Sequence, residues 1–284
     1  MEIQWFPGHM TKSMRMMEEN VKLCDGIIYV LDSRAAFACI NAKLLKIFEG
    51  KPVLFVLNKA DLITAADAAK LVSQFKAEGY NAVAVNGTVK KDASLIYAET
   101  VKMLSEKIAR NREKGVQKVL RVMVAGVPNT GKSTVINSLC GEKRAVTGDK
   151  AGVTRGKQWI KLRDIELLDT PGTMPPKFEN QHYARHLALI GSINDGILDV
   201  ETLCFEFIKE TAKTHPNQLM EKYSLTSVED KEPLEIFDEI CKRRGFLLRG
   251  NEFDYERGGK AVIDDFRKGR IGKICLETER YYEK

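Results

Sequence analysis

Two short patterns occur in this chain in an order that restricts its fold. The tetrad Asn58-Lys59-Ala60-Asp61 comes first, and a G-x-x-x-x-G-K-S loop follows at residues 126–133. Gly-Val-Thr-Arg at 152–155 and Asp-Thr-Pro-Gly at 169–172 come after both. In an ordinary small P-loop domain with these four patterns the phosphate loop comes first and the N-K-x-D tetrad later. The order here predicts a circularly permuted domain, which the chain enters through its usual second half.

The loop at 126–133 has the residues that a phosphate-binding loop requires. Gly126 and Gly131 permit a tight path on which backbone N–H groups point at phosphates, because a Cβ would block the approach or require disfavoured dihedrals. Lys132 is expected to place its charge between the β- and γ-phosphates, and the Ser133 hydroxyl is a candidate Mg²⁺ ligand. The surrounding sequence fits, since an apolar run precedes the loop and a helical pattern follows it.

The tetrad is the candidate reader of the base. The Asp61 carboxylate can accept hydrogen bonds from the N1 and N2 donors of guanine, which adenine does not offer, so one residue can discriminate between the bases. We expect Asn58 to brace neighbouring loops and the aliphatic stem of Lys59 to cover the base. Taken alone, N-K-x-D also fits a turn after a strand with solvated side chains. Together with the phosphate loop it predicts guanine specificity.

Two further segments are candidates for the γ-phosphate and the metal ion. Asp169 follows an apolar run, and we expect it to hold Mg²⁺ directly or through water, with the Gly172 amide facing the γ-phosphate. Thr154, in a loop-like stretch at 147–157, is the expected second Mg²⁺ ligand; the alternative is an ordinary loop threonine. Asn86 and Gly87 lie where a second base-supporting loop is expected, although the match is loose.

These motifs and the N-terminal Trp5-Phe-Pro-Gly-His9-Met10 sequence resemble the YlqF-type family of circularly permuted GTPases, ribosome biogenesis GTPase A. The resemblance runs from residue 3 to about residue 275 and includes Asp32-Ser-Arg34, where the family usually has D-A-R. It implies a GTPase that assists assembly of the bacterial large ribosomal subunit. The chain departs from the family at 35–41, which lack the usual proline.

The resemblance also implies an unusual catalytic arrangement. Thr173 follows the Asp-Thr-Pro-Gly motif, at the place where Ras-like enzymes carry the glutamine that orients the attacking water. His9 is then expected to order or polarise that water, as a near-neutral imidazole can. The alternative is a structural role for His9. Asn129 is a candidate ligand of K⁺ near the phosphates, unless it only stabilises its loop.

The sequence therefore predicts the following sites. The catalytic candidates are His9, Lys132 and Thr154. The GTP-binding candidates are Asn58, Lys59, Asp61, Asn86, Gly87, Asn129, Thr130, Gly131, Lys132, Ser133, Thr134 and Gly172. The metal candidates are Ser133, Thr154 and Asp169 for Mg²⁺ and Asn129 for K⁺.

The remaining sequence suggests two domains. Strand-like runs at 26–31, 52–57, 82–85, 119–125 and 165–168 alternate with helical patterns at 12–23, 41–49, 65–79, 93–112 and 133–140. The alternation predicts an α/β domain over 1–174, a parallel P-loop sheet with helices on both faces. After Pro175-Pro176 the apolar spacing is helical, which predicts a small all-helical domain over 175–284 that binds ribosomal RNA.

Composition agrees with a cytoplasmic protein. The six cysteines are scattered without a C-x-x-C pair, which favours reduced thiols. No apolar run approaches the roughly 18 residues that a membrane helix needs, so we expect no membrane insertion. His182 and His186 stand four residues apart, but without a third ligand in view two surface histidines are favoured over a metal site.

The charge is divided unevenly along the expected helical domain. Residues 195–239 hold 4 Lys/Arg and 12 Asp/Glu, whereas residues 240–284 hold 12 and 8. Basic clusters at 242–249 and 267–273 suit RNA phosphates, although solvated helix surface explains most charge runs. The predicted partners are GTP and GDP and the large subunit with its rRNA, and we expect a monomer off the ribosome. A GTP-gated RNA-binding protein with incidental hydrolysis, and a GTPase acting on another RNA client, remain alternatives.

Overall fold

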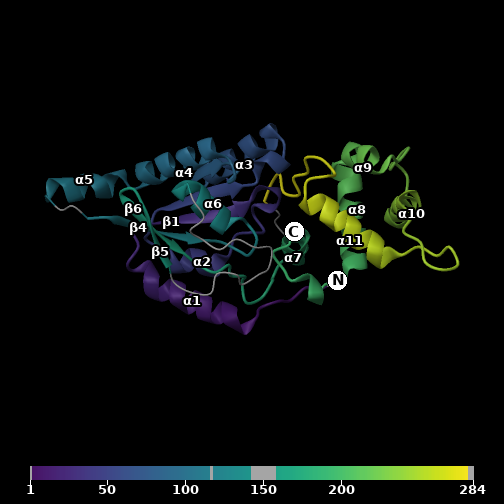
Figure 1. Cartoon of the computed structure of the whole chain (residues 1–284), viewed down its shortest axis with the longest axis horizontal. Helices are drawn as coiled ribbons and strands as arrows, with labels where there is room; N and C mark the ends of the chain where they lie inside the picture. The colour runs from purple at the N-terminus through teal and green to yellow at the C-terminus, as the bar shows by residue number, and fades with distance from the viewer. Residues whose placement is uncertain (1, 116–117, 142–157, 281–284) are drawn as a thin grey trace.

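A six-stranded sheet forms the centre of the larger part of the molecule (Figure 1). The computed structural model describes residues 2–115, 118–141 and 158–280. The strands are β1 (Gly26–Asp32), β2 (Val53–Asn58), β3 (Asn81–Ala84), β4 (Leu120–Ala125), β5 (Gln158–Leu162) and β6 (Ile165–Asp169). Their spatial order is β3-β2-β1-β4-β6-β5. The pairs β1–β2, β1–β4, β2–β3 and β4–β6 are parallel.

The permutation is visible in this order. The strand that leads into the phosphate loop, β4, lies in the middle of the sheet between β1 and β6, although it is the fourth strand of the chain. If β4, β5 and β6 are numbered 1 to 3 and β1, β2 and β3 are numbered 4 to 6, the spatial order from β5 to β3 is 2-3-1-4-5-6. The predicted P-loop fold with a permuted chain is confirmed.

One strand was missed by the sequence prediction. β5 pairs with β6 in the antiparallel direction, so the sheet is not wholly parallel. Its residues alternate between Ile160 and Leu162, which are buried, and Lys161, which is exposed. This alternation is typical of an edge strand with one covered face. The exposed Lys161 interrupts the apolar run, so the sequence pattern does not mark β5 as a strand.

Helices cover both faces of the sheet. Along β1, Ile27, Tyr29 and Leu31 belong to one buried cluster, whereas Ile28 and Val30 belong to the other. The first cluster is covered by α1 (Gly8–Val21), α2 (Ala42–Ile47) and α3 (Ala65–Ala77). The second is covered by α4 (Lys90–Met103) and α6 (Lys132–Cys140), with α5 (Ser105–Glu113) continuing beyond α4. The predicted single helix at 93–112 is therefore two helices, separated at Leu104.

The second part of the molecule is helical, as predicted. It consists of α7 (Gln181–Leu189), α8 (Val200–Thr214), α9 (Pro216–Tyr223), α10 (Pro233–Arg244) and α11 (Tyr255–Arg267). Phe207 of α8 and Phe266 of α11 lie at its centre, with ring centroids 4.9 Å apart. Helices α8 to α11 form the group at the right of Figure 1. We call α7 to α11 the helical region; the domain boundary at 174/175 stays a prediction.

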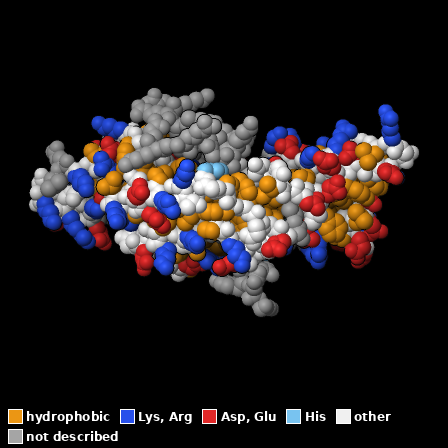
Figure 2. All heavy atoms as spheres, turned by 90° about the horizontal axis from the view of Figure 1, so that it is seen from below, with side chains coloured by type: hydrophobic (Ala, Val, Ile, Leu, Met, Phe, Trp, Pro, Cys, Tyr) orange, Lys and Arg blue, Asp and Glu red, His pale blue; other side chains and the backbone are white. Residues whose placement is uncertain are grey.

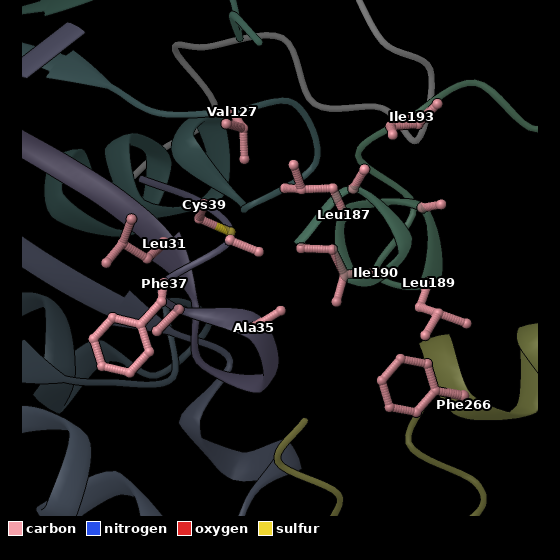
Figure 3. Packing of buried hydrophobic residues seen from close by; sticks show 14 of the residues in the cluster. Leu31, Ala35, Phe37, Cys39, Val127, Leu187, Leu189, Ile190, Ile193 and Phe266 are labelled. Carbon is pink, nitrogen blue, oxygen red and sulfur yellow. The ribbon is translucent and has the colours of Figure 1, made fainter. Parts of the chain in front are cut away.

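Helix α7 connects the two parts. Leu187 of α7 and Ile190, which directly follows the helix, lie toward the segment after β1, and Leu189 lies toward Phe266 of α11 (Figure 3). The chain also returns to the sheet after α11, because the amides of Ile274 and Leu276 donate to the carbonyls of Leu62 and Arg34 at 3.2 and 2.8 Å. One hydrophobic cluster consequently runs from the sheet into the helical region.

The expectation of two surface histidines is wrong for His186. Its side chain is fully buried, with Nδ1 2.7 Å from Glu277 Oε1 and Nε2 3.0 Å from Glu210 Oε1. Burial acts against the charged ring, but the two carboxylates outweigh it and raise the pKa of His186 to about 9. Sequence spacing did not reveal these partners, because they come from α8 and from the C-terminal segment.

None of the six cysteines, all of which the structure describes, forms a disulfide, and five of them are buried. Among the described residues, no helix combines the length and apolarity that crossing a membrane requires.

The aromatic cluster under α3 gives a stability prediction. Phe75 is buried between Phe37, stacked at 5.5 Å, and Phe55 at 4.9 Å. Phe75→Ala is expected to lower the free energy of unfolding by about 3–5 kcal/mol, because it leaves a cavity in the core. Leu95→Ala, at a 43% exposed position on α4, should cost about 1 kcal/mol or less. Urea unfolding of both variants measures this; equal losses would contradict the packing described.

Candidate nucleotide-binding site

The phosphate loop joins β4 to α6 in a conformation that requires its glycines. Gly126 has φ of 146°, and a Cβ there would lie 2.3 Å from the carbonyl oxygen of Val30. Gly131 has φ of 91°, and a Cβ there would lie 2.3 Å from Nδ2 of Asn58. Both positions exclude a side chain by backbone dihedral and by space. The loop can therefore approach neighbouring strands closely only with glycine at these two places.

Lys132 lies within the loop, at the start of α6. Its Nζ donates to the carbonyl oxygen of Val127 at 2.8 Å, and the side chain is buried. Burial lowers the pKa of this ammonium to about 8, although the nearby Asp169 carboxylate acts in the opposite direction. A Cβ on Gly172 would lie 3.0 Å from Lys132 Nζ, so the Asp-Thr-Pro-Gly segment is directly beside this lysine. The two segments expected at the γ-phosphate are thus adjacent.

Asn58 joins three loops at the end of β2. Its Nδ2 donates to the carbonyl oxygen of Thr130 at 2.8 Å, and its Oδ1 accepts from the amide of Gly87 at 2.8 Å. The expected bracing by Asn58 is confirmed. Gly87 has no room for a side chain, because a Cβ would lie 2.8 Å from Asn58 Oδ1. The segment at Asn86, the weakest of the sequence matches, therefore lies next to the tetrad and the phosphate loop.

The other loop residues take different positions. Asp61 is exposed on the turn after β2, where its carboxylate is accessible to a ligand. The Asn86 side chain accepts from the amide and hydroxyl of Thr88 at 3.0 and 2.6 Å. Thr130 is buried and its hydroxyl donates to the Val127 carbonyl at 3.1 Å, whereas Thr134 is half-buried on α6 beside Gly131.

A buried ion network behind the tetrad was not predicted. Asp32, at the end of β1, receives Nε and Nη2 of Arg34 at 2.9 and 2.8 Å and Nζ of Lys59 at 2.8 Å. Burial would raise the pKa of Asp32, but the two cations hold it well below its usual range. Lys59 also donates to the carbonyl of Asn129 at 2.8 Å. Asp32 thereby fixes the lysine of the N-K-x-D tetrad against the phosphate loop.

The same network reaches the helical region. Arg34 is 1% exposed, and its Nη1 donates to the carbonyls of Phe266 and Arg267 at 3.1 Å each, at the end of α11. Its guanidinium also lies over the Phe266 ring, 4.9 Å from the centroid. The signal in the sequence was Asp32-Ser-Arg34, which we noted for the resemblance without assigning it a contact. Its partners are 232 and 233 residues away, and no local pattern reveals them.

The residues expected at the attacking water are separated. Thr173 is fully buried, and its hydroxyl points at the sulfur of Met17 on α1 at 4.0 Å. His9 is exposed at the start of α1 and lines a cavity of about 830 Å³ together with Lys59 and Asn129. The Asn129 amide donates to the carbonyl of Gly191 at 2.6 Å, toward the helical region. His9 thus faces the same cavity as two of the nucleotide-loop residues, and Thr173 points away.

The residues present fit a magnesium ion. Asp169 is buried at the end of β6, and Ser133 is half-buried on the first turn of α6. Carboxylate and hydroxyl oxygens are hard donors of the kind that Mg²⁺ prefers. Thr154, the expected second ligand, lies outside the described residues.

Several known proteins are similar to this chain in sequence and in fold. A family model described as a 50S ribosome-binding GTPase matches residues 121–236. The chain is 38% identical to ribosome biogenesis GTPase A of Bacillus cereus over 98% of its length and 94% of that protein. It is 37% identical to ribosome biogenesis GTPase A of Priestia megaterium, over 98% of this chain and 97% of that protein. The GDP-bound structure of TM YlqF aligns with a TM-score of 0.67 at 25% identity, covering 93% of this chain and 98% of that one. The chain therefore belongs to the ribosome biogenesis GTPase A family of GTPases.

Proposed function

We propose that this GTPase assists late assembly of the large ribosomal subunit in the cytoplasm, and that hydrolysis stimulated by the subunit releases the protein. The observation that carries the nucleotide part is Asn58, which ties the tetrad, the phosphate loop and the Gly87 segment into one site. The relatives named as ribosome biogenesis GTPases support the ribosomal part.

Each loop has a chemical role in this proposal. Asp61 accepts from the guanine donors, and the stem of Lys59 covers the base. Lys132 leaves the Val127 carbonyl and neutralises the β- and γ-phosphates, while the Gly172 amide donates to the γ-phosphate. Ser133, Asp169 and Thr154 hold Mg²⁺, which when bound offsets the charge of the phosphates. His9 moves from its exposed position to orient the attacking water, since Thr173 is directed elsewhere.

A potassium ion is a further part of the proposal. Asn129 would supply an amide oxygen to K⁺ near the phosphates, where the cation substitutes for an arginine finger. In this structure the Asn129 Nδ2 donates to the carbonyl of Gly191, so the side chain that would hold the ion also contacts the segment after α7.

The surface favours one of the two basic clusters as an RNA contact. In the cluster at 267–273, Arg267 pairs with Asp195 and Lys268 with Asp264, so these charges are largely neutralised. In the other cluster Arg243 and Arg244 are also paired, with Glu239 and Asp265, but Lys242 and Arg249 are exposed. On the face shown in Figure 2, acidic side chains surround hydrophobic ones at the helical end, whereas basic side chains spread over the opposite end. We infer that RNA contacts the 242–249 segment of the helical region and the basic surface of the part that contains the sheet. The acidic remainder of the helical region is not expected to contact RNA.

Nucleotide state would reach the helical region by two short routes. The Gly172 segment lies beside Lys132 and continues into α7 within a few residues. Lys59 is linked through Asp32 and Arg34 to the end of α11. GTP would hold both routes in the arrangement that binds the subunit, and hydrolysis would release them.

Base specificity gives the first test. Asp61→Asn is expected to weaken GTP binding by about 10- to 100-fold, because a required acceptor becomes a group that also presents a donor. The variant should gain affinity for xanthosine triphosphate, whose O2 can accept from the new amide. Competition against a fluorescent guanine nucleotide measures both. Unchanged GTP affinity would contradict the assignment of Asp61.

Catalysis gives the second test. GTP turnover should be measured in potassium and in sodium buffer, with and without purified large subunits. We expect subunits to accelerate the wild type, more so in potassium, and His9→Ala to lose about 100-fold or more of that stimulated rate. His215→Ala, at a histidine that does not line this cavity, is the matched control and should behave as wild type. Equal stimulation of both variants would make His9 structural, and no stimulation would favour another RNA client or incidental hydrolysis.

The ion network gives the third test. Arg34→Lys removes the paired hydrogen bonds to Asp32 and is expected to destabilise the protein by about 2–5 kcal/mol. It should also weaken GTP binding, because Asp32, which holds Lys59, is no longer fixed by the two hydrogen bonds from Arg34. Arg121→Lys, which alters an arginine paired with Glu166 at the sheet surface, is the control. It should change neither the free energy of unfolding nor the GTP affinity strongly. Urea unfolding and nucleotide titration measure the two effects; full retention of GTP affinity by a destabilised Arg34→Lys would contradict the link.

A further inference from the structure

A cluster of metal-ligating side chains lies outside the nucleotide site. His182 and His186 are four residues apart on α7, so both rings project from one side of the helix, with ring centroids 4.1 Å apart. Glu210 comes from the facing helix α8. The three residues can each offer one ligand atom within 4.8 Å of the others. Two histidines at i and i+4 with a carboxylate from another element form a ligand set that zinc uses.

The central histidine is already oriented as a metal ligand would be. His186 Nδ1 is 2.7 Å from Glu277 Oε1, and this carboxylate is itself buried. Metal-bound histidines commonly hold their second nitrogen against a carboxylate in this way, which fixes the ring and makes the ligating nitrogen more basic. Because Nδ1 is engaged, Nε2 is the atom left for a metal ion. Nε2 is directed at Glu210.

The spacing of the atoms matches a tetrahedral site. His186 Nε2 lies 3.0 and 3.1 Å from the two carboxylate oxygens of Glu210. Two tetrahedral ligands about 2.0–2.1 Å from a zinc ion are roughly 3.3 Å apart, so small side-chain shifts would admit the ion. His182 and Glu210 are only partly buried, which leaves a route for entry and a side for a water ligand. The carboxylates of Glu210 and Glu277 make the site attractive to a cation, opposed by the neighbouring Arg185.

We propose that His182, His186 and Glu210 bind a divalent transition-metal ion, best matched by Zn²⁺, with Glu277 orienting His186. The site is distinct from the magnesium site, since its donors come from α7 and α8. Glu277 Oε2 also accepts from the amides of Phe37 and Ala38 at 2.6 and 3.0 Å, in the segment after β1. The bound ion therefore fastens α7 to α8, and through Glu277 it strengthens the attachment of the C-terminal segment to the sheet.

The test uses full-length protein without a histidine tag, stripped of metal with a chelator. We expect one equivalent of Zn²⁺ by mass spectrometry after dialysis, and Co²⁺ in its place should give visible d–d absorption without a thiolate charge-transfer band. The absence of a thiolate charge-transfer band would exclude binding by the six cysteines. His182→Ala should lose the bound ion, and Glu277→Gln should weaken binding by about 10- to 100-fold. His215→Ala, which alters a histidine outside the cluster, should bind like wild type.

A second readout separates metal binding from folding. Zn²⁺ should raise the melting temperature of wild type and His215→Ala but not of His182→Ala, with all three metal-free proteins melting similarly. If wild type binds no more metal than His182→Ala, or if cobalt shows thiolate ligation, the proposal fails. The cluster would then be a carboxylate–imidazole–carboxylate bridge that holds a proton only.

Discussion

The buried carboxylate of Asp32 is the point on which the rest of this structure depends. At the end of β1 it holds both Lys59, from the Asn58–Asp61 tetrad, and Arg34, which reaches the end of α11. A buried charge is stable only when it is paired, so each partner must stay in position while the domain is folded. The nucleotide loops and the helical region are thereby tied to one side chain, in addition to the hydrophobic packing that surrounds α7.

The permutation gives this arrangement a mechanical meaning. The phosphate-loop strand β4 is in the middle of the sheet, and β6 is the last strand along the chain. The Asp169–Gly172 segment at the end of β6 is therefore followed by α7 and not by another strand. In the unpermuted order the same segment would return to the sheet. Here it continues into α7, which contacts the segment after β1 as well as α8 and α11. In the proposed mechanism, a small change at Gly172 would be transmitted through α7 to α8 and α11 without a long path.

The sequence predicted most of the sheet and left out the long-range contacts. Five strands follow from continuous apolar runs, which are expected where helices cover a parallel strand on both faces. Phosphate-loop and tetrad residues are recognisable from spacing, because their chemistry requires particular side chains at fixed positions. The pairing of Arg34 with α11 and of His186 with Glu210 and Glu277 could not be read in this way. Such contacts depend on tertiary packing between segments far apart in the chain. Strand β5 was missed because the exposed Lys161 interrupts its apolar residues.

The most direct measurement is co-sedimentation of the wild-type protein with separated large and small ribosomal subunits, in the presence of a non-hydrolysable GTP analogue or of GDP. If nucleotide state sets the arrangement of the helical region, the GTP-analogue form should bind large subunits much more tightly than the GDP form, and neither form should favour small subunits. Equal binding of the two forms to large subunits would contradict the coupling between the nucleotide site and the helical region.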